Sequence, residues 1–180
     1  IEDRFYKGLE FGTAGLRGKL GAGTNRMNKY MVGKAAQALA ETLKDHGEEA
    51  VKRGVAISYD VRYKSKEFAE LTCSIMAAHG IKTYIYNGIH PTPMCSYAIR
   101  KLHCKAGVMV TASHNPQEYN GYKAYWEEGS QILDDIAGQI AGHMDEIVNF
   151  EDIKSIPFEE ALESGLANYI DPSVEEDYYH

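Results

Sequence analysis

Residues 107–116 read Gly107-Val108-Met109-Val110-Thr111-Ala112-Ser113-His114-Asn115-Pro116, an apolar run followed by a polar loop. The apolar half has the length of a buried strand, and Pro116 stiffens the loop. Ligands of open α/β sheets bind outside the carboxyl ends of the strands. The stretch therefore predicts a central strand whose following loop lies where such sheets bind their ligands.

Two further apolar runs of strand length, residues 54–59 and 81–86, precede this stretch. The segments around them have helical spacing or helix-capping residues and predict helices over residues 28–46, 65–79 and 91–102. An alternating order of strand and helix is typical of βαβ units, whose parallel strands lie in a helix-covered sheet. We therefore expect a parallel central sheet with helices on its faces.

The apolar segment 122–126 has a different relation to the central strand. It follows after a loop of about ten residues, which is too short for a helical crossover and favours an antiparallel partner. Asn120-Gly121 is typical of a turn that tolerates positive φ, and isoleucines at helical spacing predict one more helix over residues 132–147. The predicted fold is α/β, a three-layer α/β/α sandwich on a mixed, mostly parallel sheet.

Strand alternation divides the side chains of segment 122–126 between two faces. Tyr122, Ala124 and Trp126 share one face, whereas Lys123 lies on the other, so its ammonium need not be buried without a partner. The antiparallel return brings Lys123 back toward Ser113. There its charge can neutralise a phosphate, or it can carry a proton.

Charge divides the chain near residue 145. The net charge is −7, but residues 1–144 carry 18 basic and 15 acidic side chains, whereas residues 145–180 carry 1 basic and 11 acidic ones. Acidic and turn residues become denser after residue 150. We therefore expect one folded domain over residues 1–150. Residues 151–180 are expected to form an acidic connector, a solvated helix and linker leading toward a second domain absent from this sequence.

No acidic residue occurs between Glu10 and Glu41, and five basic residues fall in this interval: Arg17, Lys19, Arg26, Lys29 and Lys34. This local excess fits a site for a small anion such as a sugar phosphate, and it equally fits a solvated basic face without a ligand. A pI of about 5.5 argues against nucleic acid as a partner, as does the absence of interleaved aromatic and basic residues.

The composition excludes several classes of protein. Of the 180 residues, 44% are hydrophobic and 25% are charged, which excludes a disordered or collagen-like chain. No run approaches the roughly 18 apolar residues of a membrane span, and no leader is evident, so we expect a cytoplasmic protein without a membrane partner. Cys73, Cys95 and Cys104 form no C-x-x-C pair, so reduced thiols are expected.

Two loops contain residues suited to phosphate chemistry. Ser113 is a candidate nucleophile with His114 beside it, although a Ser-His pair alone is more typical of a turn with a local hydrogen bond. No G-x-S-x-G elbow is present, which argues against acyl hydrolysis. The Gly-rich loop 11–18 contains Arg17, whose planar guanidinium suits phosphate, although a flexible turn fits the same residues.

Four segments together resemble the N-terminal domain of the α-D-phosphohexomutases, the family of phosphoglucomutases and phosphomannomutases. They are FGTAGLRG at 11–18, YDVRYKS at 59–65, TASHNP at 111–116 and NGYKAYW at 120–126. The segments follow one another in the family's order. TASHNP is the most specific of them.

The resemblance implies a role for each of several residues. Ser113 would carry the phosphoryl group, with Lys123 and His114 as the other catalytic residues. The residues implied in binding phosphate or substrate are Arg17, Thr13 and Asn115. Asp60 and Arg62 are expected to support the loops rather than to react.

The resemblance also implies Mg²⁺, bound partly through the phosphate on Ser113, and a hexose 1,6-bisphosphate intermediate between hexose 1-phosphate and hexose 6-phosphate. The family's metal loop, D-G-D-x-D-R, does not occur here, so the remaining metal ligands are expected on the second domain. The chain is thus expected to be the phosphoserine-bearing domain of a phosphohexomutase, inactive without the remaining domains of the polypeptide. A non-enzymatic sugar-phosphate-binding or regulatory module that retains the loops is the alternative.

Overall fold

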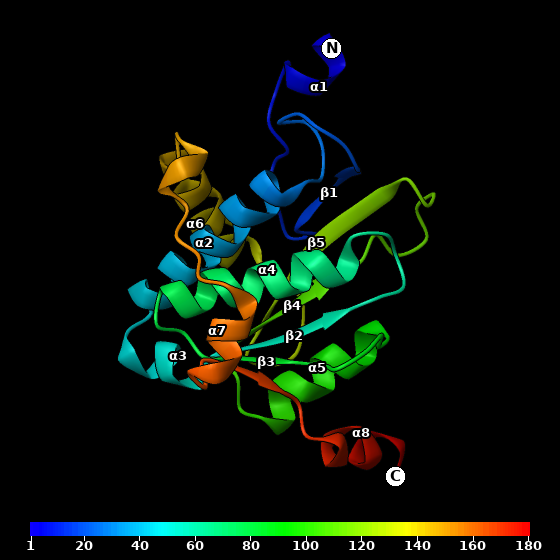
Figure 1. Cartoon of the computed structure of the whole chain (residues 1–180), viewed down its shortest axis with the longest axis vertical. Coiled ribbons are helices and arrows are strands. Elements are labelled where there is room, and N and C mark those ends of the chain that lie inside the picture. Colours follow the sequence, from blue (N-terminus) through cyan, green and yellow to red (C-terminus); the bar gives the residue numbers. More distant parts are fainter.

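The structure, a computed structural model, describes all 180 residues and contains a six-stranded sheet between layers of helices (Figure 1). The order of strands across the sheet is β1-β5-β4-β2-β3-β6. The strands are β1 (Leu16–Lys19), β2 (Val55–Tyr59), β3 (Thr83–Ile85), β4 (Ala106–Val110), β5 (Tyr119–Trp126) and β6 (Ala167–Tyr169). This mixed sheet confirms the predicted α/β/α sandwich.

The centre of the sheet is parallel. β2 pairs in parallel with β4 and β3, and β6 extends the parallel part beyond β3. All residues of β2 and β4 are buried, as expected for parallel strands covered on both faces. β5 runs antiparallel to β4, as the short preceding loop predicts, and also to β1.

Helices cover both faces of the sheet. The larger apolar core lies beneath α2 (Lys29–Asp45), α4 (Ser65–Ala78), α6 (Asp134–Glu146) and α7 (Phe158–Glu163), and the smaller one beneath α5 (Thr92–Lys101) and α8 (Pro172–Tyr179). Val55 and Ile57 of β2 belong to the larger core, whereas Ala56 belongs to the smaller one. Shorter helical pieces are α1 (Glu2–Phe5), α3 (Glu48–Arg53) and η1 (Phe150–Asp152).

Asn28 fixes the start of the longest helix. Its Oδ1 accepts hydrogen bonds from the backbone N–H groups of Tyr30 and Met31, at 3.1 Å each, which is the role of an N-cap residue. Its Nδ2 donates to the carbonyls of Gly21 and Gly23 at 2.9 Å. One side chain therefore caps α2 and holds the loop between β1 and α2.

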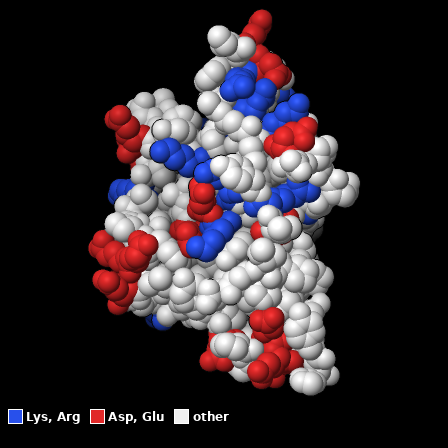
Figure 2. Space-filling model, turned by 45° about the vertical axis from the view of Figure 1, so that its right-hand side comes forward, with Lys and Arg blue, Asp and Glu red and all other residues white.

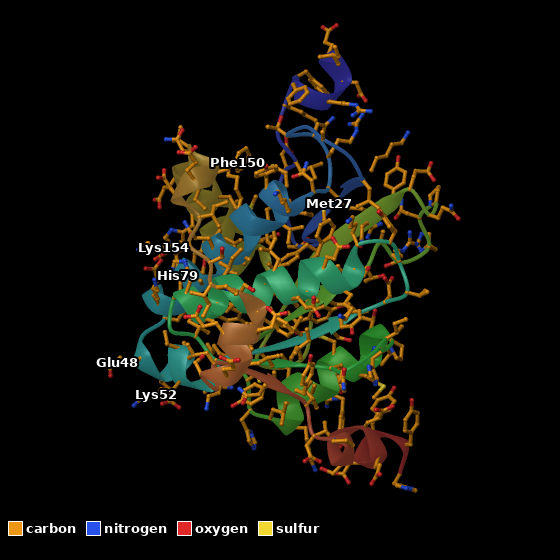
Figure 3. All side chains as sticks on the ribbon, in the orientation of Figure 1. Met27, Glu48, Lys52, His79, Phe150 and Lys154 are labelled. Atoms are coloured by element: carbon orange, nitrogen blue, oxygen red, sulfur yellow. The ribbon has the colours of Figure 1, made fainter.

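The segment after α6 is tied to the helices by Gln37, which is buried on α2. Its Nε2 donates to the carbonyl of Asp152 at 3.2 Å, and its Oε1 accepts from the backbone N–H of Lys154 at 2.8 Å. His79 contacts the same Oε1 through Nε2 at 3.1 Å, and Figure 3 shows His79 next to Lys154. The chain therefore runs back across α2 and α4 rather than away from them.

The Gly-rich N-terminal loop is more ordered than the sequence predicts. Residues 16–19 form β1, an edge strand in which Arg17 pairs with Gly121. The predicted turn at Asn120-Gly121 is wrong, because both residues lie inside β5. The need for glycine at 121 is steric: a Cβ there would lie 2.5 Å from the carbonyl oxygen of Thr111 and 2.9 Å from that of Leu16.

Residues 151–180 also differ from the predicted solvated connector. They supply α7, strand β6 and helix α8, and Ala161, Ala167, Ile170 and Val174 are buried in the two cores. Asp177 pairs with Lys101 of α5 at 2.7 Å. The sheet therefore extends past the predicted boundary at residue 150. The few apolar residues of this segment are obscured in the sequence by the acidic ones around them.

No helix is both long and apolar enough to cross a membrane. The three cysteines are free and buried, in agreement with the predicted reduced thiols. Burial raises the pKa of each thiol to about 12, which keeps the sulfur protonated and unreactive at neutral pH.

We predict that Gly121→Ala destabilises the fold by about 1–3 kcal/mol, because the added methyl group overpacks the β4-β5-β1 junction. Thermal unfolding followed by circular dichroism measures the loss. Gly138→Ala on the exposed face of α6 is the control, since nothing lies within 4 Å of its Cβ position. The control is expected to raise stability by about 0.5–1 kcal/mol. Equal unfolding temperatures for Gly121→Ala and the wild type would contradict the close approach.

Candidate phosphoryl-transfer site

The loop after β4 lies at the carboxyl edge of the parallel strands. β2 and β4 are paired in register as far as Tyr59 and Val110, so the loops that follow them emerge side by side. Figure 2 shows Lys and Arg side chains over the upper and middle parts of one face, with several acidic side chains among them and a further acidic group at the lower end, where Figure 1 places α8. At the loop after β4, three cationic side chains, those of Arg17, Arg62 and Lys123, form hydrogen bonds to Ser113 or Asn115.

Ser113 is exposed and has a backbone φ of +55°, in the left-handed region that few non-glycine residues adopt. Its N–H donates to Oγ1 of Thr111 at 2.9 Å. Its Oγ accepts a hydrogen bond from Nζ of Lys123 at 2.6 Å. The prediction that Lys123 returns to Ser113 is thus confirmed. The left-handed backbone of Ser113 is a strained conformation of a kind that is common at functional sites.

Lys123 reaches Ser113 from the middle of β5, opposite Met109 of β4. Partial burial lowers the pKa of its ammonium, the nearby Arg17 guanidinium lowers it further, and Asp60 opposes both effects. A lysine with a lowered pKa exchanges its proton more readily near neutral pH. Lys123 is therefore suited both to neutralise an anion on Ser113 and to move a proton.

A second contact in the same loop joins the side chains of Arg17 and Asn115. Nη1 of Arg17 donates to Oδ1 of Asn115 at 2.9 Å, a contact made possible by the pairing of β1 with β5. The structure gives the exposed Arg17 side chain only this one hydrogen bond. Its remaining N–H groups are free to bind an anion beside Ser113.

The side chains of Thr13 and His114 form no hydrogen bond with these groups. Thr13 is exposed at the tip of the tight turn from Gly12 to Gly15, and His114 is exposed with no hydrogen bond in the structure. Of the six predicted site residues, the structure therefore joins Ser113 to Lys123 and Arg17 to Asn115, and leaves two at the periphery.

Supporting residues come from the loop after β2. Arg62 donates to the carbonyl of Ser113 at 2.6 Å and lies 3.5 Å from the Asp60 carboxylate, which confirms the expectation that this pair supports the loop. Sequence reasoning missed Thr111, Ser65 and Asn120. Ser65 bonds to Asp60 at 2.8 Å and to Asn120 at 3.0 Å. The only signal for Ser65 was its place in the YDVRYKS segment.

The residues present do not form a magnesium site by themselves. The structure contains no group of three or more His, Cys, Asp or Glu side chains placed to hold a metal ion. The nearest side-chain charge to Ser113 Oγ is the ammonium of Lys123, and carboxylate is the side-chain ligand that Mg²⁺ prefers. Mg²⁺ at Ser113 would therefore need ligands other than a cluster of such side chains from this chain.

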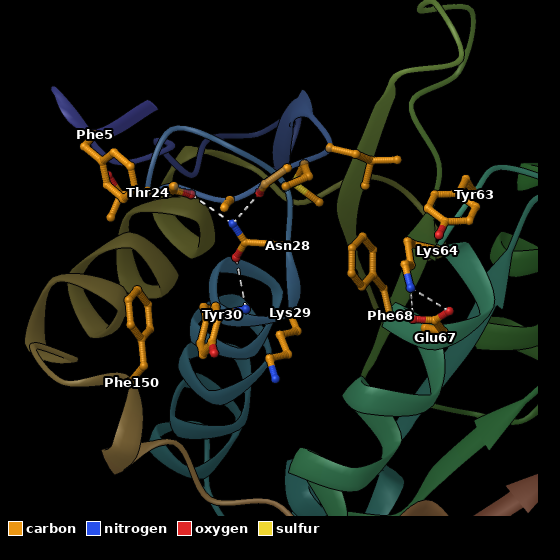
Figure 4. A pocket seen from close by; sticks show the side chains of 15 residues that line it. Phe5, Thr24, Asn28, Lys29, Tyr30, Tyr63, Lys64, Glu67, Phe68 and Phe150 are labelled. Atoms are coloured by element: carbon orange, nitrogen blue, oxygen red, sulfur yellow. Dashed lines mark hydrogen bonds and ion pairs between the residues drawn. The ribbon is translucent and has the colours of Figure 1, made fainter. Parts of the chain in front are cut away.

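A separate apolar cavity of about 740 Å³ lies between the N-terminal ends of α2 and α4. Figure 4 shows Phe5, Tyr30 and Phe150 on one side of it and Tyr63 and Phe68 on the other. Ser113, Lys123 and Arg17 are not among the residues that line it. The cavity is therefore distinct from the polar cluster around Ser113.

A serine with two cationic side chains at the carboxyl edge of an α/β/α sheet is an arrangement suited to binding an anion such as phosphate. Comparison with known proteins identifies the family to which the domain belongs. Residues 8–150 match the family model described as phosphoglucomutase/phosphomannomutase, alpha/beta/alpha domain I. The chain belongs to this family and contains its domain I.

Individual relatives agree with the family model. The chain is 40% identical over 171 residues to a phosphoglucomutase of Staphylococcus epidermidis, covering 95% of this chain and 31% of the relative. It is 47% identical over 125 residues to a probable phosphoribomutase of Schizosaccharomyces pombe, covering 69% and 21%. The chain thus spans about a third or less of these relatives' length.

Solved structures show the same fold. A putative phosphomannomutase from Thermus thermophilus superposes with a TM-score of 0.74 at 26% identity, over 92% of this chain and 34% of that one. A phosphoglucomutase from Paramecium, pp63/parafusin in its open form, gives a TM-score of 0.69 at 25% identity, over 87% and 28%. The recognition of the family from its four segments is confirmed.

We predict that Arg17→Ala raises the pKa of Lys123, because it removes a positive charge that disfavours the protonated amine. Titration of the Lys123 side chain by NMR measures the change. Lys19→Ala is the matched control: it removes one positive charge from the same face of β1 but is not among the groups that act on Lys123. An unchanged or lower pKa in Arg17→Ala would show that the two cations do not interact.

Proposed function

We propose that this chain is the phosphoryl-carrying domain of a phosphohexomutase, and that Ser113 carries the phosphoryl group. The observation that supports this most strongly is the 2.6 Å contact between Ser113 Oγ and Lys123 Nζ. A serine oxygen directly against a lysine of lowered pKa, on a cationic edge, suits repeated gain and loss of a phosphoryl group. Membership of the phosphoglucomutase/phosphomannomutase family supports the same assignment.

The proposed reaction interconverts hexose 1-phosphate and hexose 6-phosphate in two transfers. In the first, the bond between phosphorus and Ser113 Oγ breaks while phosphorus bonds to a free hydroxyl oxygen of the hexose phosphate. Lys123 gives a proton to Oγ, and the amine of Lys123 then takes up the proton that the sugar hydroxyl loses. In the second, Oγ attacks the other phosphate of the resulting hexose 1,6-bisphosphate, and the bond between that phosphorus and the sugar oxygen breaks. Lys123 gives its proton to the released sugar oxygen and takes up the Oγ proton in its place. No net phosphate is consumed.

Charge on the transferring group explains the remaining roles. Arg17 binds phosphate through the N–H groups that its bond to Asn115 leaves free. Asn115 orients Arg17, while the exposed Thr13 and His114 contact the substrate from the rim once it is bound. Mg²⁺ would add positive charge beside a phosphate on Ser113, with its other ligands supplied from outside this chain.

The complete activity requires the remaining domains of a longer polypeptide. The relatives are roughly three times as long as this chain, and we propose that residues after α8 continue into the other domains of such an enzyme. The names of these relatives refer to glucose, mannose and ribose. Glucose and mannose are hexoses, and we propose a hexose phosphate as the substrate. We place the enzyme in the cytoplasm, where sugar phosphates are metabolised.

A chimera tests the proposal. This chain replaces the matching segment of the Staphylococcus epidermidis phosphoglucomutase, and conversion of glucose 1-phosphate is measured with Mg²⁺ and glucose 1,6-bisphosphate. We predict turnover that Ser113→Ala lowers by about 10⁴-fold or more, as expected when a covalent nucleophile is removed.

Ser130→Ala, an exposed serine in the turn after β5, is the control and keeps full turnover. A folded chimera without turnover that still binds hexose phosphate would instead identify a sugar-phosphate-binding module. Turnover that survives Ser113→Ala would show that another group carries the phosphoryl group.

A further inference from the structure

The guanidinium of Arg62 lies at the centre of the Ser113 loop. Its Nη2 donates to the carbonyl oxygens of Ser113 at 2.6 Å and Asn115 at 2.7 Å. Its Nη1 donates to those of Pro116 at 3.0 Å and Tyr119 at 3.1 Å. Three carbonyls of the loop and that of the first residue of β5 therefore converge on a single side chain.

This arrangement uses both terminal nitrogens of Arg62 fully. A guanidinium has five N–H groups. Four of them bind the four carbonyls, and Nε faces the Asp60 carboxylate at 3.5 Å. The side chain is only 13% exposed. Arg17, with a single hydrogen bond, remains able to bind substrate, whereas the four Nη hydrogens of Arg62 are already bound to main-chain carbonyls.

Arg62 is itself held in place from behind. Oδ1 of Asp60 accepts from the backbone N–H of Arg62 at 3.0 Å and from Ser65 Oγ at 2.8 Å. Asn120 donates to the same Ser65 hydroxyl at 3.0 Å, which links this support to the first residues of β5. The backbone N–H of Asp60 also donates to the carbonyl of Val110, the last residue of β4, at 3.2 Å. The guanidinium is therefore fixed relative to both β4 and β5, the strands that flank the loop.

The contacts explain how Ser113 keeps its left-handed backbone. Four carbonyl dipoles that point at one spot repel one another unless a cation lies between them. Arg62 provides that cation and binds the carbonyl of Ser113, while Lys123 binds the hydroxyl of the same residue. Ser113 is thus held by its main chain on one side and by its side chain on the other.

We propose that Arg62 is a positioning residue for phosphoryl transfer: it fixes the backbone of Ser113 so that Oγ points at Lys123 and the substrate. The inference rests on the proposed function of Ser113. Arg62 does not touch the reacting atoms. Lysine cannot replace it, because a single ammonium has three N–H donors and no planar fork to span the four carbonyls.

The first experiment needs no activity. In the 180-residue chain, Arg62→Ala and Arg62→Lys are compared with the wild type by NMR. We expect amide exchange at Asn115 and Tyr119 to accelerate by at least about tenfold, while amides in β2 and β4 keep their protection. The carbon shifts of Ser113 should move away from those of a left-handed backbone.

The second experiment uses the chimeric enzyme. Arg62→Lys and Arg62→Ala are expected to lower kcat by about 100-fold, the effect of misplacing a reacting group by about 1 Å, with KM changed less than about threefold. Millimolar guanidinium should restore part of the kcat of Arg62→Ala.

Arg53→Ala is the matched control. Arg53 also binds two backbone carbonyls, of His103 and Cys104, and the carboxylate of Glu127, but it precedes β2 at the opposite end of the sheet. It should cost stability without changing the Ser113 loop or kcat.

Wild-type protection and carbon shifts in both Arg62 variants would overturn the proposal, whatever the activity. If the wild-type chimera is active and both Arg62 variants have the same kcat as it does, the proposal is overturned too. It is also overturned if Arg53→Ala lowers kcat as much as the Arg62 variants do. An inactive wild-type chimera would count against the proposed function, while the NMR result would still decide the role of Arg62.

Discussion

The parallel pairing of β2 with β4 is the constraint on which the site depends. The register runs from Val55 beside Ala106 to Tyr59 beside Val110, so both strands end at the same level. The loop that begins at Asp60 therefore emerges next to the loop that contains Ser113. Because both strands are buried on both faces, a shift in register would displace the whole core.

Antiparallel pairing adds the cationic groups to this edge. β5 returns beside β4 and carries Lys123 back to Ser113, and β1 pairs with β5 and carries Arg17 to Asn115. The two cations have different roles: burial and the neighbouring guanidinium lower the pKa of Lys123, whereas Arg17 keeps most of its donors free. One is suited to proton transfer, and the other to holding phosphate.

The sequence predicts those elements whose apolar residues repeat with a clear period. The strands at 55–59 and 106–110, the helices around Leu39 and Ile140, and the return of Lys123 are all predicted correctly. β1 is a short edge strand with a single apolar residue, Leu16, and therefore has no such pattern. The apolar residues of β6 and α8 are too sparse among acidic ones. The convergence of four carbonyls on Arg62 could not be predicted, because it depends on the directions in which main-chain carbonyls point. The pattern of residue types in a sequence does not specify these directions.

Phosphate mapping tests the central claim most directly. The chimeric enzyme is exposed to glucose 1,6-bisphosphate and Mg²⁺, digested, and analysed by mass spectrometry. The account predicts one phosphate per chain, on Ser113, which is removed when glucose 6-phosphate is added as acceptor. Phosphate on another residue, or an active enzyme whose Ser113 stays unmodified, would contradict it.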